Sequence, residues 1–123
     1  MSPIIELACV VVDCQDPAGV AAFYRAASGG EITHHDDDSA WVAMAGTTWI
    51  FRKVEGYVPP TWPSPEVPPQ MHMDFFVSDL DTAEKQLHAH GATTPEHQPN
   101  DRARGLLVML DPAGHPFCIA ARR

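Results

Sequence analysis

A histidine and an aspartate stand two residues apart in segment 71–77, whose apolar and aromatic content predicts a β-strand. Side chains of a strand alternate between its two faces, so His72 and Asp74 share one face. An imidazole beside a carboxylate can act as an acid or base toward a bound molecule, or orient it by hydrogen bonds. The two groups can equally satisfy each other. We take His72 and Asp74 as candidate catalytic residues.

The run HHDDD at 34–38 also consists of residue types that bind metal ions. Adjacent side chains in a hairpin turn rarely converge on one point, so we interpret this run as a solvated turn. The sequence contains no Gly-rich phosphate loop and no nucleophile elbow. The candidate chemistry therefore centres on the strand that carries His72 and Asp74.

The elements that position these residues belong to an internal repeat. Each copy runs from a strand through an aspartate into a helix, as CVVVDCQDPAGVAAFY in the first half and HMDFFVSDLDTAEKQL in the second. Asp16 aligns with Asp79 at an offset of 63, and a later pair of segments aligns Gly46 with Gly114 at an offset of 68. Two related halves predict a pseudo-symmetric domain with a binding site between them.

The first half begins with a predicted strand over Ile5–Val12, which is rich in β-branched residues. Asp16 followed by Pro17 is typical of a helix N-cap and first turn, and Gly29 is expected to end that helix. Three short strands are then predicted over 31–34, 40–44 and 47–53.

Alternation in the last of these strands directs Trp49 and Phe51 toward the helix, and Ile50 and Arg52 to the opposite face. The Arg52 guanidinium is suited to an anionic group of a ligand or to the carboxylate of Asp74. A solvated charge at the end of the strand is the alternative.

Residues 54–70 contain six prolines and predict a stiff, extended connector. The second half repeats the plan of the first, with elements expected at 71–77 (strand), 80–90 (helix), 92–97, 105–110 and 116–121 (strands). Each half is thus β-α-β-β-β, with too few helices for a ferredoxin-like sandwich. We expect a single domain over 1–123, made of module one (1–53), the connector (54–70) and module two (71–123).

Composition limits the partners. A net charge of −8 over 123 residues argues against nucleic acid and mildly favours neutral or cationic ligands. No apolar run reaches the roughly 18–20 residues of a membrane span, and the first residues lack the basic region of a signal peptide. Three cysteines without framework spacing suit a reducing compartment, so we expect a cytoplasmic protein without membrane partners.

The order of these motifs, with DPAGHPF opening the last strand, resembles the vicinal oxygen chelate superfamily of glyoxalase I, bleomycin-resistance proteins and extradiol dioxygenases. The segment YVPPTWPSPEVPPQMHMDFFVSDLDTAE and the ending DPAGHPFCI are similar to its glyoxalase-like domain subgroup. The resemblance implies an α+β fold in which two pseudo-symmetric β-α-β-β-β modules form an eight-stranded cup-shaped sheet with the helices outside. It also implies a small-molecule ligand in the cup and a homodimer.

Catalytic members of the superfamily hold a divalent metal in the cup on four ligands, usually His and Glu. The resemblance carries these ligand positions onto Cys9, Ile50, His72 and Cys118. Ile50 has no donor atom, and thiolates select softer metals than Mg, Mn, Fe or Ni, so we expect no metal and no other cofactor. Alternatively, Cys9, His72 and Cys118 would hold zinc as a Cys2His set with one open position. Thiols packed as small apolar groups, and a Cys9–Cys118 disulfide, are the other possibilities.

The expected ligand-binding surface combines the carried positions with the strand neighbours, as Cys9, Ile50, Arg52, His72, Asp74 and Cys118. This mixture of apolar and polar groups suits a small, partly polar organic molecule. We predict a small-molecule-binding protein of the glyoxalase/bleomycin-resistance type without the usual metal centre. The alternative is a lyase, isomerase or dioxygenase acting on a small organic substrate in the same cup, either metal-dependent or through His72 and Asp74.

Overall fold

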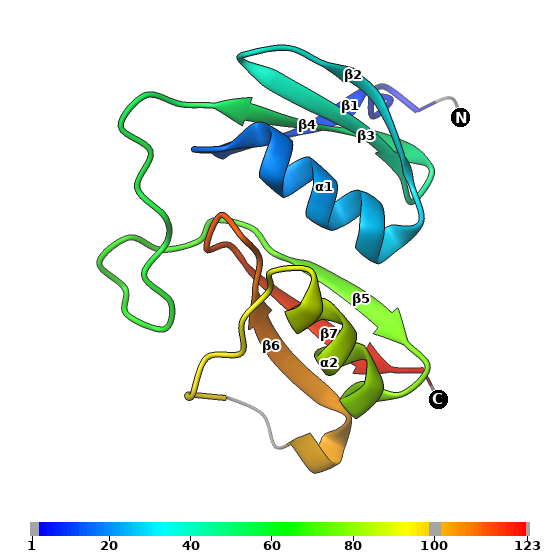
Figure 1. The fold of residues 1–123 in the computed structure, drawn as a ribbon, viewed down its shortest axis with the longest axis vertical. Coiled ribbons are helices and arrows are strands. Elements are labelled where there is room, and N and C mark those ends of the chain that lie inside the picture. Colours follow the sequence, from blue (N-terminus) through cyan, green and yellow to red (C-terminus); the bar gives the residue numbers. More distant parts are fainter. Residues whose placement is uncertain (1–2, 99–101, 123) are drawn as a thin grey trace. The chain divides into compact units, whose positions relative to one another are not determined.

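The computed structural model describes residues 3–98 and 102–122, which form two compact units with a boundary between Tyr57 and Val58 (Figure 1). The first unit holds five elements in chain order, β1 (Cys9–Cys14), α1 (Pro17–Ser28), β2 (Glu31–His35), β3 (Ser39–Met44) and β4 (Thr47–Lys53). The strands form one sheet in the order β1-β4-β3-β2, in which β1 runs parallel to β4 and the other pairs are antiparallel.

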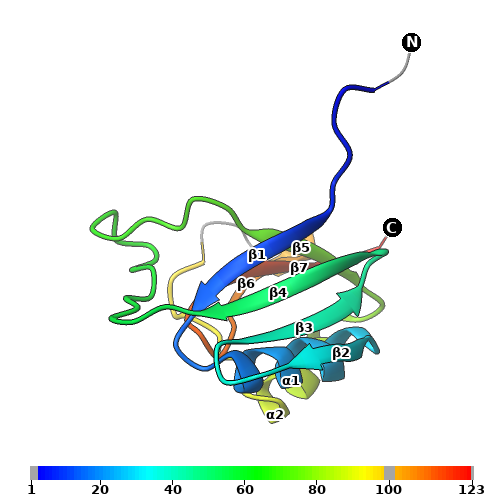
Figure 2. The ribbon, with the colours of Figure 1, turned by 90° about the horizontal axis from the view of Figure 1, so that it is seen from above.

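Helix α1 covers one face of this sheet (Figure 2). Phe51 of β4 is fully buried, and its ring stacks on that of Tyr24 of α1 with 5.3 Å between the ring centroids. Val20 and Phe23 of α1 and Val42 of β3 are also buried in this core. The predicted direction of Phe51 toward the helix is thus confirmed. We call the opposite face of each sheet its helix-free face.

The first strand begins later than the sequence suggested. β1 starts at Cys9, whereas Ile5 and Leu7 are 86% and 67% exposed. The reason lies in pairing, because Cys9 is already opposite Thr48 and β4 itself begins at Thr47. In this parallel register Ile5 and Leu7 lie beyond the start of β4, and β-branched content alone does not make a strand without a partner.

The second unit holds β5 (Met73–Val77), α2 (Leu80–Ala89), a short 3-10 helix η1 (Arg102–Arg104), β6 (Leu106–Leu110) and β7 (Pro116–Ala121). Its sheet has the order β5-β7-β6, with β5 parallel to β7 and β6 antiparallel to it. Its largest buried side chains are Leu107, Met109, Phe117 and Ile119. Neither α1 nor α2, the α-helices of the described residues, has the length and hydropathy that crossing a bilayer requires.

Helix α2 begins with an N-cap that matches the predicted repeat. The Asp79 carboxylate accepts hydrogen bonds from the backbone N–H of Thr82 at 2.9 Å and from its hydroxyl at 2.6 Å. Its counterpart Asp16 stands at the N-cap of α1, but its side chain makes no capping hydrogen bond. Gly29 ends α1 in the left-handed conformation with φ of 74°, as expected.

The strand expected near 92–97 is replaced by two separate contacts. Thr93 forms a single bridge with Leu110, and the Gln98 side-chain amide bonds both the N–H and the carbonyl of Val108, at 2.8 and 2.9 Å. Pro95 has no N–H to donate, which disfavours a continuous strand here. The described residues therefore form sheets of four and three strands, and an eight-stranded cup is not observed.

The strand register preserves the internal repeat. Val11 of β1 stands opposite Ile50 of β4, and Asp74 of β5 stands opposite Cys118 of β7. These pairs are related by the same offsets, 63 and 68, that align the two halves of the sequence. The two halves thus share both the order of their first elements and their parallel pairing.

Candidate functional site

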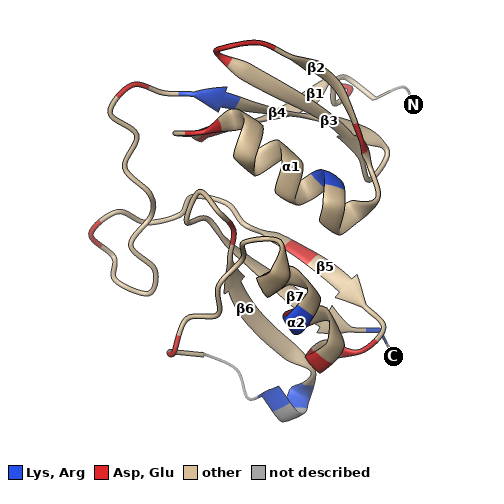
Figure 3. Ribbon diagram, viewed as in Figure 1, with Lys and Arg blue, Asp and Glu red and all other residues tan. Residues whose placement is uncertain are grey.

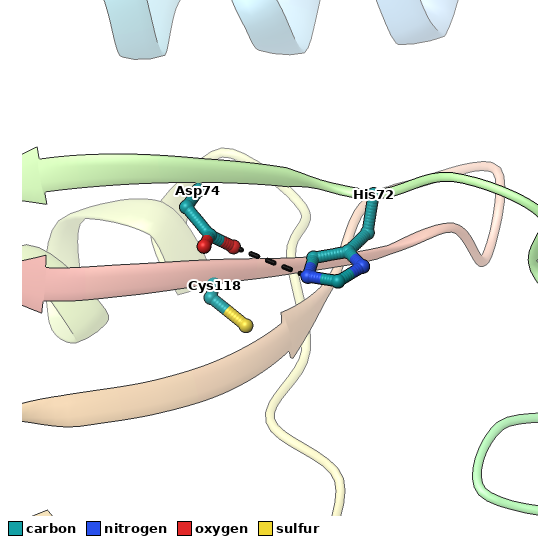
Figure 4. Close-up of side chains that lie close together, drawn as sticks. All are labelled: His72, Asp74 and Cys118. Carbon is teal, nitrogen blue, oxygen red and sulfur yellow. Dashed lines mark ion pairs between the residues drawn. The ribbon is translucent and has the colours of Figure 1, made fainter.

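Three chemically reactive side chains meet on the helix-free face of the second unit (Figure 4). His72 lies just before β5, Asp74 is in β5, and Cys118 is opposite Asp74 in β7. One donor atom from each residue lies within 4.8 Å of the others, and Nε2 of His72 is 3.3 Å from Oδ1 of Asp74. The shared face predicted for His72 and Asp74 is therefore present, and Cys118 joins it.

The pair of His72 and Asp74 is open to solvent. Their side chains are 54% and 64% exposed. An exposed ion pair of this kind contributes about 1 kcal/mol or less to stability, and only when the imidazole is protonated. Such a weak mutual contact leaves both groups able to exchange partners with a bound molecule.

Cys118 is half-buried beside this pair. Burial raises the pKa of the Cys118 thiol to about 11, and the negative charge of Asp74 and a hydrogen bond with it act in the same direction. The thiol is therefore protonated at neutral pH, where it is a weak nucleophile. This environment argues against covalent catalysis through Cys118 in the metal-free protein and leaves it a polar, soft contact.

An apolar surface continues from Asp74 along the same strand. Phe76 stands two residues after Asp74 and is 64% exposed, and the Arg122 guanidinium lies over its ring at 4.3 Å from the centroid. A cation over an aromatic face contributes roughly 0.5–1 kcal/mol at an exposed position. The helix-free face thus offers a carboxylate, an imidazole, a thiol and an aromatic ring.

The other predicted site residues lie in the first unit, on its own helix-free face. Cys9 and Ile50 are half-buried on the neighbouring parallel strands β1 and β4. Val11, opposite Ile50, is 48% exposed, which leaves an apolar surface on this sheet. Cys9 and Ile50 belong to one unit while His72 and Cys118 belong to the other, so the convergence of all four positions stays a prediction.

The sequence reasoning missed one aromatic residue of this surface. Trp41 of β3 stands opposite Ile50, is 37% exposed, and makes an edge contact with the His34 ring at 5.2 Å between centroids. The structure buries Ala40 and Val42 on either side of Trp41. The signal available in the sequence was alternation in β3, which places Trp41 on the opposite face from these two residues.

Arg52 already has a partner in the first unit. Its Nε and Nη2 atoms donate to Oδ1 of Asp13 at 3.1 and 2.8 Å, across the paired strands β1 and β4. Arg52 and Lys53 make the end of β4 a basic patch, seen in blue in Figure 3. A ligand that binds Arg52 must share it with Asp13, an alternative that the sequence reasoning did not include.

The side chain of Asp36, in the acidic turn after β2, is hydrogen-bonded to neighbouring residues of the same hairpin. Asp36 accepts hydrogen bonds from His34 at 2.9 Å and from the N–H groups of Asp38 and Ser39 at 2.8 and 2.9 Å. The hydrogen bond with His34 is the largest cause of the lowered pKa of Asp36, followed by the two backbone bonds. Residues 34–38 are all exposed, as the interpretation of a solvated turn requires.

A separate groove of about 540 Å³ lies in the first unit, between the C-terminal end of α1 and the turn that joins β3 to β4. It is lined by residues 28–30 and 43–48. No predicted site residue lines this groove, and its walls offer backbone, small side chains and Met44 rather than titratable groups. The groove and the cluster of His72, Asp74 and Cys118 are therefore in different places. The cluster is the better candidate site, because a site needs groups that can recognise a ligand.

The fold agrees with the comparisons to known proteins. A family model for the glyoxalase-like domain matches residues 9–120. The chain therefore belongs to the glyoxalase-like domain family, within the vicinal oxygen chelate superfamily, which confirms the resemblance drawn from the sequence. The comparison with curated proteins found no match.

Solved structures share the fold at low sequence identity. The fosfomycin resistance protein FosX from Listeria monocytogenes is 16% identical, with a TM-score of 0.71 over 98% of this chain and 96% of its own. A glyoxalase/bleomycin resistance protein/dioxygenase family enzyme from Burkholderia phytofirmans is 17% identical, with a TM-score of 0.72 over 95% and 98%. A glyoxalase/bleomycin resistance protein from Albidiferax ferrireducens is 20% identical, with a TM-score of 0.63 over 95% and 98%.

The donor atoms at the carried ligand positions do not match a hard divalent ion. FosX has been crystallised with Mn(II), an ion that prefers carboxylate and imidazole ligands. In this chain Ile50 offers a hydrocarbon, and Cys9 and Cys118 offer sulfur. Only His72 keeps a ligand of the expected type.

Proposed function

We propose that this protein binds a small organic molecule on its helix-free sheet surfaces, without the four-ligand hard-metal centre of catalytic relatives. The observation that carries the proposal is the meeting of His72, Asp74 and Cys118 on an exposed surface that has an aromatic neighbour in Phe76. Binding or sequestration, in the manner of antibiotic-resistance members of the family, needs such a recognition surface and no catalytic metal.

The charges of the site favour a neutral or cationic ligand. Asp74 contributes a carboxylate that is 64% exposed, and the whole chain carries a net charge of −8. The phosphonate bound to FosX is an anion, and the like charge of Asp74 opposes such a group. Cys9, Ile50 and Arg52 of the first unit are proposed to complete the binding surface.

The proposal extends to the assembly and place of action. β1 and β5 are each one of the two outer strands of their sheets in the described part of the chain, and outer strands leave ladder groups that other chains can pair with. We therefore propose a homodimer that covers them, in a reducing cytoplasm where Cys9 and Cys118 stay as thiols.

The test begins with a panel of small neutral and cationic organic molecules and with fosfomycin as an anionic comparison, screened by saturation-transfer NMR against the tag-free protein. The affinity of the best binder is then measured by calorimetry. Loss of the His72 or Asp74 side chain should weaken it by about tenfold or more, since a hydrogen bond to a charged group contributes about 1.5–3 kcal/mol.

The matched control is the first unit's own exposed pair, His34 and Asp36, at 2.9 Å. His34→Ala should leave the affinity within about twofold of the wild type, whereas His72→Ala and Asp74→Ala should not. Equal losses in all three variants, or tight binding of fosfomycin alone, would contradict the proposed site.

A second candidate function is favoured by the 3.3 Å contact between His72 and Asp74. A carboxylate that orients an imidazole is the arrangement of a general base, which can abstract a proton from a small substrate. The protein would then be a lyase or isomerase of the same ligand class. Turnover of the bound molecule, lost in His72→Ala with binding retained, distinguishes this function from binding alone.

A further inference from the structure

We propose that His72, Asp74 and Cys118 form a zinc site contained within the second unit. The inference goes beyond the proposed function, which requires no metal. It also differs from the ligand set carried over from the family, because Asp74 is not among those four positions and no ligand from the first unit is needed.

The distances fit tetrahedral coordination. Zinc binds nitrogen and oxygen at about 2.0–2.2 Å, so two such ligands of one tetrahedral ion stand roughly 3.3–3.5 Å apart. Nε2 of His72 and Oδ1 of Asp74 are 3.3 Å apart, and the Cys118 sulfur lies within 4.8 Å of both. Small rotations of the exposed His72 and Asp74 side chains are enough to bring all three donors onto one ion.

The backbone holds the three residues in place. Asp74 and Cys118 are register partners on parallel strands, and the ladder of β5 and β7 fixes the separation of their Cα atoms. His72 lies one residue before β5, with its Nε2 3.3 Å from Oδ1 of Asp74. Asp74 and Cys118, which lie in strands, are positioned more precisely than ligands on loops.

The donor types select zinc over harder ions. Imidazole, carboxylate and thiolate are all zinc ligands, whereas a thiolate is a poor ligand for Mg or Mn. When zinc binds, the Cys118 S–H bond breaks, the sulfur keeps the electron pair and forms the Zn–S bond, and the proton goes to solvent. The charges of Asp74 and the new thiolate then balance those of the ion.

The arrangement leaves a fourth position for water or a ligand. His72 and Asp74 are more than half exposed, so the ion would be accessible from solvent. Three protein ligands with one open position are typical of zinc sites that act on a bound molecule rather than only stabilising a fold.

The experiment uses the tag-free, reduced protein after dialysis against a chelator, titrated with zinc in competition with a chromophoric chelator. One equivalent should bind. Asp74→Ala and Cys118→Ser should each weaken binding at least about 100-fold, since even outer-shell partners of metal ligands cost 10–100-fold. Cobalt added in place of zinc should give a thiolate-to-metal charge-transfer band, which Cys118→Ser abolishes.

Two control variants make the test specific. His34→Ala removes an imidazole that is paired with the carboxylate of Asp36. This pair is not part of the cluster of His72, Asp74 and Cys118, so the variant should not change zinc affinity. Cys9→Ser removes the thiol of the first unit and should also leave zinc affinity unchanged. Circular dichroism of each variant confirms that it is folded.

The proposal is overturned if the wild type binds no zinc, if Asp74→Ala binds as tightly as the wild type, or if Cys9→Ser weakens binding as much as Cys118→Ser. The last result would assign the ion to the Cys2His set that spans both halves. Failure of the zinc proposal is distinguishable from failure of the proposed function when the calorimetric measurement of ligand affinity is made on protein dialysed against a chelator.

Discussion

Asp74 and Cys118 stand opposite each other on β5 and β7, at the register position that Val11 and Ile50 occupy on β1 and β4. One copy of the repeat thus holds a carboxylate and a thiol where the other copy holds two hydrocarbon side chains. The fold is duplicated, but the chemistry is not. We infer that the polar cluster of His72, Asp74 and Cys118 belongs to the second half alone.

The two faces of β4 should differ sharply in their contribution to stability. Phe51→Ala is expected to lower the free energy of unfolding by about 3–5 kcal/mol, because it empties a fully buried site stacked on Tyr24. Ile50→Ala, one residue earlier on the helix-free face, should cost about 1 kcal/mol or less. Urea denaturation of both variants measures the difference, and equal losses would contradict the assignment of the two faces.

The N-cap of α2 should titrate at low pH. Hydrogen bonds from Thr82, first from its hydroxyl and then from its backbone N–H, hold the pKa of Asp79 below its ordinary value. The stabilisation by the cap is therefore fully present above the ordinary pKa of Asp and is lost as the pH falls through the lowered pKa. Thr82→Ala should raise the pKa of Asp79 in an NMR titration, while the pKa of Asp36 stays unchanged as an internal control.

Cys118 should react slowly with alkylating reagents. Because burial and Asp74 raise the pKa of its thiol from 9.0 to about 11, little thiolate is present until the pH is well above neutral. Asp74→Asn removes the negative charge and so lowers the pKa of Cys118. At a pH of about 9, close to the ordinary pKa of a thiol, the variant should be alkylated severalfold faster than the wild type. Mass spectrometry of the modified peptide follows the rate in the metal-free protein, and an unchanged rate would show that Asp74 does not act on the thiol.

Sequence patterns were sufficient where local signals and pairing agree. The helix after Asp16, the strands that flank Gly46, and the strand that follows DPAGHP were all placed within about two residues of their positions in the structure. The shared face of His72 and Asp74 followed from alternation alone. The association of His72 and Asp74 with Cys118 was predicted only from the internal repeat and the family resemblance, not from alternation.

Other features depend on partners that a sequence does not display. Ile5 has the composition of a strand residue but no β4 residue to pair with, so it lies outside β1. The expected strand near 92–97 gave way to the Gln98 amide, a side chain that bonds β6 in place of a backbone. The sequence left Arg52 with an anionic ligand group, Asp74 or solvent as alternatives, whereas the parallel register places Asp13 beside it.

Light scattering tests the proposed dimer. A tag-free sample at micromolar concentration should give about twice the chain mass of 13.4 kDa, because a second copy covers the outer strands β1 and β5. Val11→Lys places a charge on the outer strand β1 and is expected to shift the mass toward the monomer. A wild-type mass near 13.4 kDa would contradict the dimer.

The most direct test of the proposed ligand site is an NMR map of the backbone amides during titration with the best neutral or cationic binder from the screen. We predict the largest shifts at His72, Asp74 and Cys118, with smaller shifts at Ile50 of the first half. The same titration of Asp74→Ala should lose most of these shifts. Shifts confined to the groove at residues 28–30 and 43–48, with none along β5 and β7, would contradict the account.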